Sequence, residues 1–468
     1  MSPATIQQSP FPENQHSHGD GSASIHFALL GGGLMSFCAN VAHGETASAL
    51  LARLAGAARA RGAHAIQGTV FCDPTDAEAK KISGGGSGSG GAGGDLGAGA
   101  DGGGGDVVDF PVACLGRHDT PRGHVLGARI TALPAGTFER VKDERGANCG
   151  ARWETDSARY LLLGALVPRD TGAARDEQAA ALWRSLKARI ENAGFTIGDL
   201  VRTWFYNDHI LDWYAEFNRV RNAFFTENNI FGTLVPASTG IGASNAAGAA
   251  LTVDALAIAP KMAAAAGAAQ ARVLSAGGGT QDSGGGTQDS GGGTQDSGLR
   301  TQDAEGGMRD GFGVSIAAVT SPLQCPAYDY KSAFSRAVEC AEPGAGGLRL
   351  LTISGTASIA PGGLTAHVGD VDAQIDLTLR VVAAILESRG MSWRDTARAI
   401  LYFPKIEWMP RWHARRVALG LPELPAVFAH TDICRDDLLF EIELDATTRL
   451  RREIPNPKIP NPKIPNPK

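Results

Sequence analysis

The feature that most constrains the fold of this chain is an internal repeat. Residues 159 to 258 and residues 349 to 446 show the same order of elements: an apolar strand, an amphipathic helix, a second strand, a second helix and two further apolar stretches. Both first helices stop at a glycine, Gly194 or Gly390, placed as a C′ cap. The pattern predicts α+β units, each a mixed sheet covered by helices on one side.

The two repeats align residue by residue from these glycines. Arg202 of the first repeat then matches Arg398 of the second, and Tyr206 matches Tyr402. After a length change in the second helix, Thr252 lies opposite Glu441. One copy therefore carries a carboxylate where the other has a threonine, which favours a single site that one copy has lost.

The final strand of the second repeat, FEIELD, alternates apolar and acidic residues. Side chains of a strand point to opposite faces in turn, so one face is apolar and the other acidic. The apolar face is predicted to be core. The acidic face, with Glu441, Glu443 and Asp445, is either exposed to solvent or part of an acidic site, and the local pattern leaves both open.

Segments of low complexity divide the chain of 468 residues. Glycine-rich residues, three GGGTQDS copies and three IPNPK copies cannot pack into a core. The predicted organisation is a disordered leader at 1–24, an N-terminal domain at 25–260 with a glycine-rich loop at 84–105, a flexible linker at 261–312, a C-terminal catalytic domain at 313–447 and a tail at 448–468.

Composition excludes several classes of function. A net charge of −6 offers no broad basic surface for nucleic acid, and no apolar stretch reaches the roughly 18 residues that a membrane span needs. The leader does not resemble a secretion signal. Seven cysteines are scattered without a C-x-x-C pair, which favours the reducing cytoplasm over a disulfide framework. The dispersed histidines predict no metal site, and no cofactor is expected.

Several arginines are candidates for binding an anion. Arg202 shares a strand face with Tyr206, Arg336 precedes the first long strand of the second repeat, and Arg415 lies on its last helix. Taken singly, an arginine in such a position is more often an ordinary surface residue. Together they suit a substrate with two negative charges, because guanidinium groups bind carboxylates in bidentate geometry.

The second repeat resembles the RidA/YjgF family, whose fold is like that of trimeric chorismate mutases. The resemblance rests on AFSRAV, on LLTISGTASI and on the final LLFEIELDA. A tandem of two such units, with WFYNDHILDWYAEFNRVR and PASTGIG in the first and DICRDDLLFEIELDA in the second, is similar to the chorismatases. This likeness covers roughly residues 110 to 260 and 315 to 446.

The resemblance implies a function. Chorismatases release pyruvate from chorismate without a cofactor, and the likeness assigns the general acid to Glu441. It also implies that Arg336 and Ala337 of AFSRAV bind substrate, together with Arg202, Tyr206 and Arg415.

The resemblance extends to the product. A cysteine at the place of Cys434 accompanies the members that form 3-hydroxybenzoate, with 4-hydroxybenzoate as a second product, although a buried cysteine is also an ordinary small hydrophobic residue.

Three alternatives stay open. A hydrolytic chorismatase would give a dihydroxycyclohexadiene carboxylate instead. A RidA-type imine or enamine deaminase would need an arginine directly after the Pro-Ala pair, where this chain has Ser238 and Val427. A non-enzymatic small-molecule binder is also compatible with the fold. In each case the expected partner is a small molecule, and the protein is expected to be a monomer or weak oligomer with its two units packed against each other.

Overall fold

The computed structural model describes residues 24–84, 108–261, 309–310, 313–330, 332–342 and 347–449. The strands of these residues form three mixed sheets. The expected leader, the glycine-rich loop, the GGGTQDS repeats and the IPNPK tail lie, apart from a few edge residues, outside the described residues. None of the helices in the described part of the chain is long and apolar enough to cross a membrane.

The N-terminal unit, here unit A, forms the first sheet in the order β1-β2-β5-β3-β4, with the short β11 (Ser244–Asn245) beside β4. Gly31, Gly32 and Gly33, with positive φ of 90°, 57° and 83°, make the tight turn between β1 and β2. Its elements are β1 (His26–Gly31), β2 (Leu34–Asn40), α1 (Ala47–Arg59), β3 (Ala63–Cys72), α2 (Ala77–Gly84), β4 (Val112–Gly116) and β5 (Val125–Pro134).

The middle unit, unit B, forms the second sheet in the order β10-β9-β12-β8-β7-β6. Its helix α3 ends before Gly194, whose φ of +85° confirms the predicted C′ cap. Its elements are β6 (Phe138–Lys142), β7 (Asn148–Glu154), β8 (Ala158–Leu166), α3 (Arg175–Asn192), β9 (Leu200–Asn207), α4 (Ile210–Glu227), β10 (Ala237–Gly242) and β12 (Leu251–Pro260).

The C-terminal unit, unit C, forms the third sheet in the order β13-β14-β15-β16-β19-β17-β18. Asp370 caps its first helix by accepting a hydrogen bond from Ala373 N, and Gly390 follows its end with a φ of +66°. Its elements are β13 (Arg309–Asp310), β14 (Ser315–Val319), β15 (Ala337–Ala341), β16 (Leu348–Ala357), α6 (Val371–Ser388), β17 (Thr396–Phe403), α7 (Met409–Ala418), β18 (Ala426–His430) and β19 (Glu441–Arg449).

The α+β fold with helices on one side of each sheet is confirmed. In all three units a helix follows the second strand of a hairpin, and the next two strands pair in parallel, as β3 with β4, β9 with β10 and β17 with β18. The segment 25–260, which the sequence analysis treats as one domain, thus contains two sheets. Unit A is hard to recognise in the sequence because residues 85–107 separate α2 from β4.

Strand pairing shows which residues of the three units are equivalent. Tyr206 of β9 pairs with Thr252, and Tyr402 of β17 pairs with Glu441, so the predicted match of Thr252 with Glu441 is confirmed. The same place in unit A is occupied by the pair of Phe71 with Gly127. The acid position of the fold therefore holds glycine, threonine and glutamate in units A, B and C.

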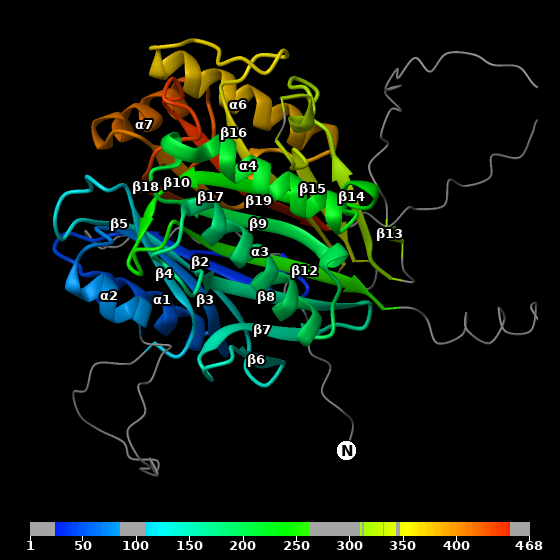
Figure 1. The fold of residues 1–468 in the computed structure, drawn as a ribbon. Helices are drawn as coiled ribbons and strands as arrows, with labels where there is room; N and C mark the ends of the chain where they lie inside the picture. The colour runs from blue at the N-terminus through cyan, green and yellow to red at the C-terminus, as the bar shows by residue number, and fades with distance from the viewer. Residues whose placement is uncertain are drawn as a thin grey trace, which may run out of the picture.

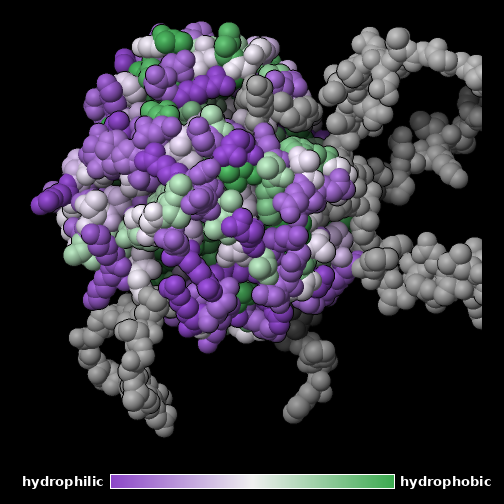
Figure 2. Space-filling model, viewed as in Figure 1, coloured by the Kyte–Doolittle hydropathy of each residue, from purple (hydrophilic) through white to green (hydrophobic). Residues whose placement is uncertain are grey.

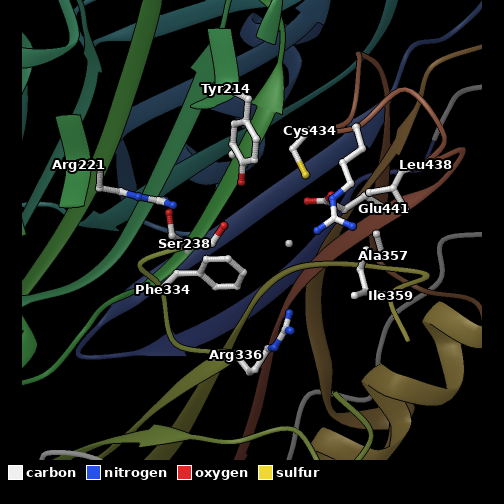
Figure 3. Close-up of a pocket in the computed structure, with 14 residues that line it drawn as sticks. Tyr214, Arg221, Ser238, Phe334, Arg336, Ala357, Ile359, Cys434, Leu438 and Glu441 are labelled. Atoms are coloured by element: carbon white, nitrogen blue, oxygen red, sulfur yellow. The ribbon is translucent and has the colours of Figure 1, made fainter. Parts of the chain in front are cut away.

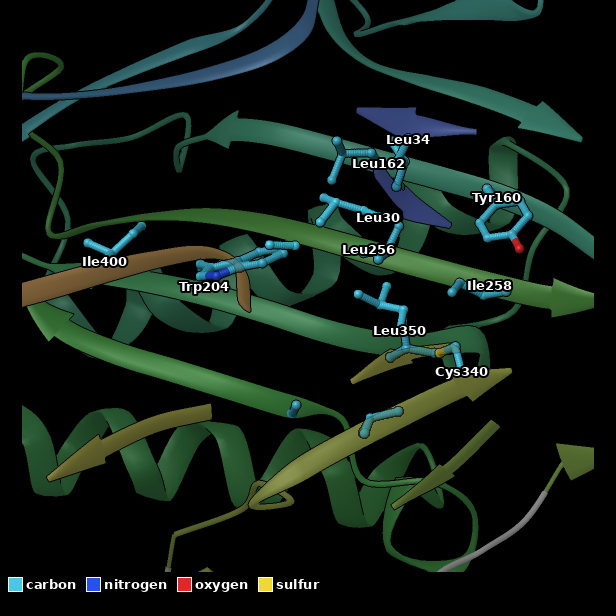
Figure 4. Close-up of a cluster of buried hydrophobic side chains, with 14 of the residues drawn as sticks. Leu30, Leu34, Tyr160, Leu162, Trp204, Leu256, Ile258, Cys340, Leu350 and Ile400 are labelled. Atoms are coloured by element: carbon cyan, nitrogen blue, oxygen red, sulfur yellow. The ribbon is translucent and has the colours of Figure 1, made fainter. Parts of the chain in front are cut away.

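The helices of each unit lie on a different outer side of the molecule, with α6 and α7 at the top of Figure 1, α1 and α2 at the lower left, and α3 and α4 in front. One apolar cluster lies between the sheets and includes Leu30, Leu162, Leu256 and Leu350 (Figure 4). Further clusters lie between each sheet and its own helices. On the face shown in Figure 2, hydrophilic side chains dominate and apolar residues form small separate groups.

Charged residues are also buried between the sheets. Glu443 of β19 accepts hydrogen bonds from Arg202 of unit B at 2.9 Å, from Arg398 at 2.9 Å and from the indole of Trp204 at 2.9 Å. Arg398 also donates to Asp445 at 2.7 Å. Carboxylates buried this deeply need such partners, because desolvation would otherwise favour their neutral form.

We expect the Arg398→Met substitution to lower the free energy of unfolding by about 3–5 kcal/mol, because it leaves two buried carboxylates short of a cation. Urea unfolding followed by circular dichroism measures this change. The matched control is Arg394→Met, at an exposed position of the same unit, which should stay within about 0.5 kcal/mol. Equal effects of both substitutions would contradict a stabilising role for the buried pairs.

Candidate active site

Glu441 opens strand β19 and lies at the junction of units B and C. Phe440, Ile442 and Leu444 are fully buried against the helices of unit C, as the alternating pattern predicts. The acidic face is also buried, since Glu441 is 5 % exposed and Glu443 is 0 % exposed. Of the two interpretations that the sequence left open, the solvent-exposed acidic face is therefore wrong.

A narrow pocket with a cavity of about 50 Å³ adjoins the Glu441 carboxyl (Figure 3). Unit B supplies one wall from α4 and β10, and unit C supplies the other from the segment before β15, the end of β16 and the segment before β19. The lining residues are Tyr214, Arg221, Ser238, Gly240, Ser332, Phe334, Arg336, Gly355, Ala357, Ile359, Cys434, Arg435, Leu438 and Glu441.

Gly355 of β16 gives the Glu441 side chain its space. A Cβ atom at this position would lie 2.0 Å from Glu441 Oε1, far inside the contact distance. The same residue donates its backbone N–H to Thr239 Oγ1 of unit B at 3.0 Å, which holds the two units together beside the pocket. A glycine is thus required where the backbone approaches the carboxyl.

The environment of Glu441 favours its protonated form. Burial raises the pKa of its carboxyl to about 8, the nearby charge of Glu443 acts in the same direction, and Arg202 and Arg336 oppose it. At Glu443 burial also disfavours ionisation, but Arg202 and Arg398 outweigh it and hold the pKa at about 2. Two carboxyls on one strand face therefore differ in protonation, which suits Glu441 to donate a proton at neutral pH.

Three guanidinium groups line the pocket. Arg336 donates from Nε at 3.1 Å and from Nη2 at 2.7 Å to the carbonyl of Cys325. Arg435 donates to the carbonyl of Gly363 at 2.7 Å, and Arg221 stacks on the ring of Phe217 at 5.2 Å. These contacts orient three cations around a small volume, which is the arrangement that a ligand with more than one carboxylate needs.

Cys434 and Tyr214 form a neutral part of the wall. Burial raises the pKa of the Cys434 thiol to about 12, the nearby Glu441 adds to this, and Arg435 and Tyr214 oppose it. Burial likewise raises the pKa of the Tyr214 hydroxyl. Beside Glu441 the pocket thus has an uncharged thiol and an uncharged phenol, both visible above the carboxyl in Figure 3.

The structure brings together three of the residues singled out in the sequence: Glu441, Arg336 and Cys434. It does not bring the other four to the pocket. Arg202 is 1 % exposed and is paired with Glu443 one layer deeper, and Tyr206 is fully buried between the sheets. Ala337 pairs with Ile353 within the third sheet, and Arg415 pairs with Asp376 of α6.

Sequence reasoning missed several lining residues. Phe334 and Gly355 lie within the quoted AFSRAV and LLTISGTASI stretches, and Arg435 directly follows Cys434, so proximity to these motifs was the available signal. Tyr214 and Arg221 come from α4 of the other unit, seven positions apart on one helix face. Only the docking of unit B on unit C places them at the pocket.

Comparisons with known proteins bear on the fold. The chain matches no protein-family model, and no curated protein sequence matches it. Among solved structures, a chorismatase aligns over 82% of this chain and 92% of its own, with a TM-score of 0.51 and 19% sequence identity. The E. coli YjgF gene product aligns over 28% of this chain and 98% of its own, with a TM-score of 0.23 and 18% identity.

Yeast Mmf1 aligns over 28% of this chain and 97% of its own, with a TM-score of 0.23 and 13% identity. The chorismatase match extends over most of the chain. The chain therefore has the fold of that chorismatase.

The raised pKa of Glu441 predicts a specific dependence of stability on pH. Between the ordinary value of 4.5 and about 8, the folded chain holds a proton at this carboxyl that the unfolded chain releases. The stability that this proton contributes is complete below pH 4.5 and is lost as pH rises through 8. We expect the melting temperature of the native protein to fall relative to that of the Glu441→Gln variant over this interval.

Scanning calorimetry of both proteins between pH 4.5 and about 8 measures the difference in melting temperature. Glu387→Gln, at an exposed position of α6, is the matched control and should follow the native protein. A constant difference between the native protein and Glu441→Gln would mean that the carboxyl is ionised as usual.

Proposed function

We propose that this protein is a chorismatase that releases pyruvate from chorismate, with 3-hydroxybenzoate as the main product and 4-hydroxybenzoate as a second one. The observation that carries the proposal is a single carboxyl with a pKa raised to about 8, Glu441, in a pocket lined by three arginines. The fold shared with a solved chorismatase supports it. No cofactor is needed for the steps below.

The reaction begins with a proton transfer. Chorismate carries an enol ether, and its terminal methylene accepts a proton from the Glu441 carboxyl to give an oxocarbenium ion. In the proposed route the bond between the ether oxygen and the ring carbon then breaks, the ether oxygen leaves as the keto oxygen of pyruvate, and the neighbouring hydroxyl oxygen bonds to that ring carbon. A general acid works best when its pKa lies near the working pH, as the value of about 8 at Glu441 provides.

In the proposed complex, arginines bind the two carboxylates of the substrate. Arg336, Arg435 and Arg221 lie on different sides of the pocket and can contact two separated anionic groups. The cavity of about 50 Å³ is smaller than a ring with two carboxylates. Entry of chorismate therefore requires side chains of the wall, such as that of Phe334, to move.

Cys434 supports the choice of product. Its neutral thiol and the apolar side chains of Leu438 and Ile359 offer an attacking water few hydrogen bonds. The substrate's own hydroxyl is then the nearest nucleophile for the ring carbon that loses pyruvate. Loss of a proton from the ring, which the ionised Glu441 carboxylate can accept, then leaves the aromatic ring.

The position that would anchor a deaminase substrate argues against that alternative. Ser238 lines the pocket at the place directly after the Pro-Ala pair of unit B, and Val427 occupies the equivalent place in unit C. Neither side chain can pair with a carboxylate as an arginine does.

One chain supplies both walls of the pocket, which supports action as a monomer or weak oligomer. We also propose the cytoplasm as its location. None of the seven cysteines, all of which lie within the described residues, forms a disulfide bond.

Glu441→Gln should abolish pyruvate release from chorismate, because the amide keeps the shape of the side chain but cannot donate the proton. We expect a loss of about 10²- to 10⁴-fold in the turnover rate. Coupled detection of pyruvate measures the rate, and Glu387→Gln serves as the matched control with unchanged turnover. Near-native turnover by Glu441→Gln would contradict the role of this carboxyl, and binding of chorismate without turnover by the native protein would favour a non-enzymatic binder.

Heavy-oxygen water distinguishes the two chorismatase reactions. If the substrate's own hydroxyl attacks, the phenolic oxygen of 3-hydroxybenzoate comes from chorismate and contains no label. Mass spectrometry of the isolated product reads this directly. Label in the ring product, or a dihydrodiol as the main product, would overturn the assigned product while leaving Glu441 as the acid.

A further inference from the structure

The three units meet at three equivalent interfaces, and the Glu441 pocket occupies one of them. There β10 of unit B lies against β16 of unit C, and Ser354 Oγ accepts a hydrogen bond from Ser238 N at 2.9 Å. At the second interface β4 of unit A faces β8 of unit B, and at the third β18 of unit C faces β2 of unit A. Each of the other two is a place where the same architecture can form a pocket.

The interface between units C and A is closed. Gly127 stands at the acid position, and a Cβ atom there would lie 2.7 Å from Val427 Cγ1. The Asn40 amide donates to the carbonyl of Ala426 at 3.1 Å and accepts from Phe428 N at 3.1 Å. Side chains and hydrogen bonds thus fill the space that the pocket occupies elsewhere.

The interface between units A and B contains a cavity of about 390 Å³. Its walls correspond to those of the Glu441 pocket: α2 and the start of β4 stand in for α4 and β10, and the end of β8 stands in for the end of β16. Ile82, Phe110 and Val112 of unit A and Leu166 of unit B give it apolar surface. The volume of this cavity and its apolar side chains are typical of small-molecule binding sites.

Cations outnumber anions around this cavity. Its charged lining residues are Lys80, Arg145, Arg169 and Arg189 against Asp143 and Glu144. Two of the arginines share one carboxylate, since Glu144 lies 2.9 Å from Arg169 and 3.1 Å from Arg189. The Arg189 side chain is only 13% exposed and also donates to Ser185 Oγ at 3.3 Å, so its guanidinium is fixed at the wall.

We propose that this cavity is a second, non-catalytic binding site for a small cyclic or aromatic carboxylate. The carboxylate is held by Arg189 and its neighbouring cations, and the ring lies against Phe110 and Val112. Thr252 stands at the acid position of this unit, so the site has no counterpart of Glu441. The site therefore retains its ligand unchanged.

Calorimetric titration of the full chain with 3-hydroxybenzoate tests the site. We expect saturable binding that weakens at least tenfold in Arg189→Gln and persists in Arg336→Gln, because the two arginines belong to different pockets. Arg184→Gln, at an exposed position of the same helix α3, is the matched control and should bind as the native protein does. The second variant is Lys80→Glu on α2, which changes an exposed side chain. It should also weaken the binding of 3-hydroxybenzoate.

Loss of all binding in Arg336→Gln, or native binding in both Arg189→Gln and Lys80→Glu, would overturn the proposal. The assay measures binding without turnover. Its outcome is therefore independent of whether the protein converts chorismate.

Discussion

The structure depends on buried ion pairs at the junctions of its three sheets. Glu443 of unit C is held by Arg202 of unit B, and Asp254 of unit B lies 3.3 Å from Arg129 of unit A. Removing these charges from water is costly, and only docking of the units in one register supplies their partners. The same ions set the chemistry nearby, because Glu443 stays charged at full burial and so favours the neutral form of Glu441 two residues away.

The three units share a fold but differ at the acid position. This difference explains why only unit C has a carboxyl group there. The acid position holds Gly127 in unit A, Thr252 in unit B and Glu441 in unit C. Two of these choices fit their own interface: the glycine leaves room for Val427, and the glutamate needs Gly355 opposite it. The units thus keep the same strand order but differ in the residue at this position.

The sequence alone was sufficient to predict the order of strands and helices within units B and C. Helix ends at Gly194 and Gly390 and the pairing of Thr252 with Glu441 follow from local rules of capping and strand alternation. The sequence did not reveal unit A. Its equivalent strand pair is Phe71 with Gly127, whereas units B and C have a tyrosine opposite a threonine or a glutamate. The sequence also predicted that Arg202 contacts the substrate. A strand pattern shows on which face of a sheet a residue lies, but it does not show how deeply another unit buries that residue.

We expect Glu441 to be neutral at physiological pH while Glu443 is charged, and the assignment of Glu441 as the acid depends on this difference. A carbon NMR titration of the chain with glutamate labelled at the side-chain carboxyl, compared with the Glu441→Gln variant, identifies the Glu441 signal by its absence from the variant. We expect this signal to titrate with a midpoint of about 8. A midpoint near the ordinary value of 4.5 would contradict it.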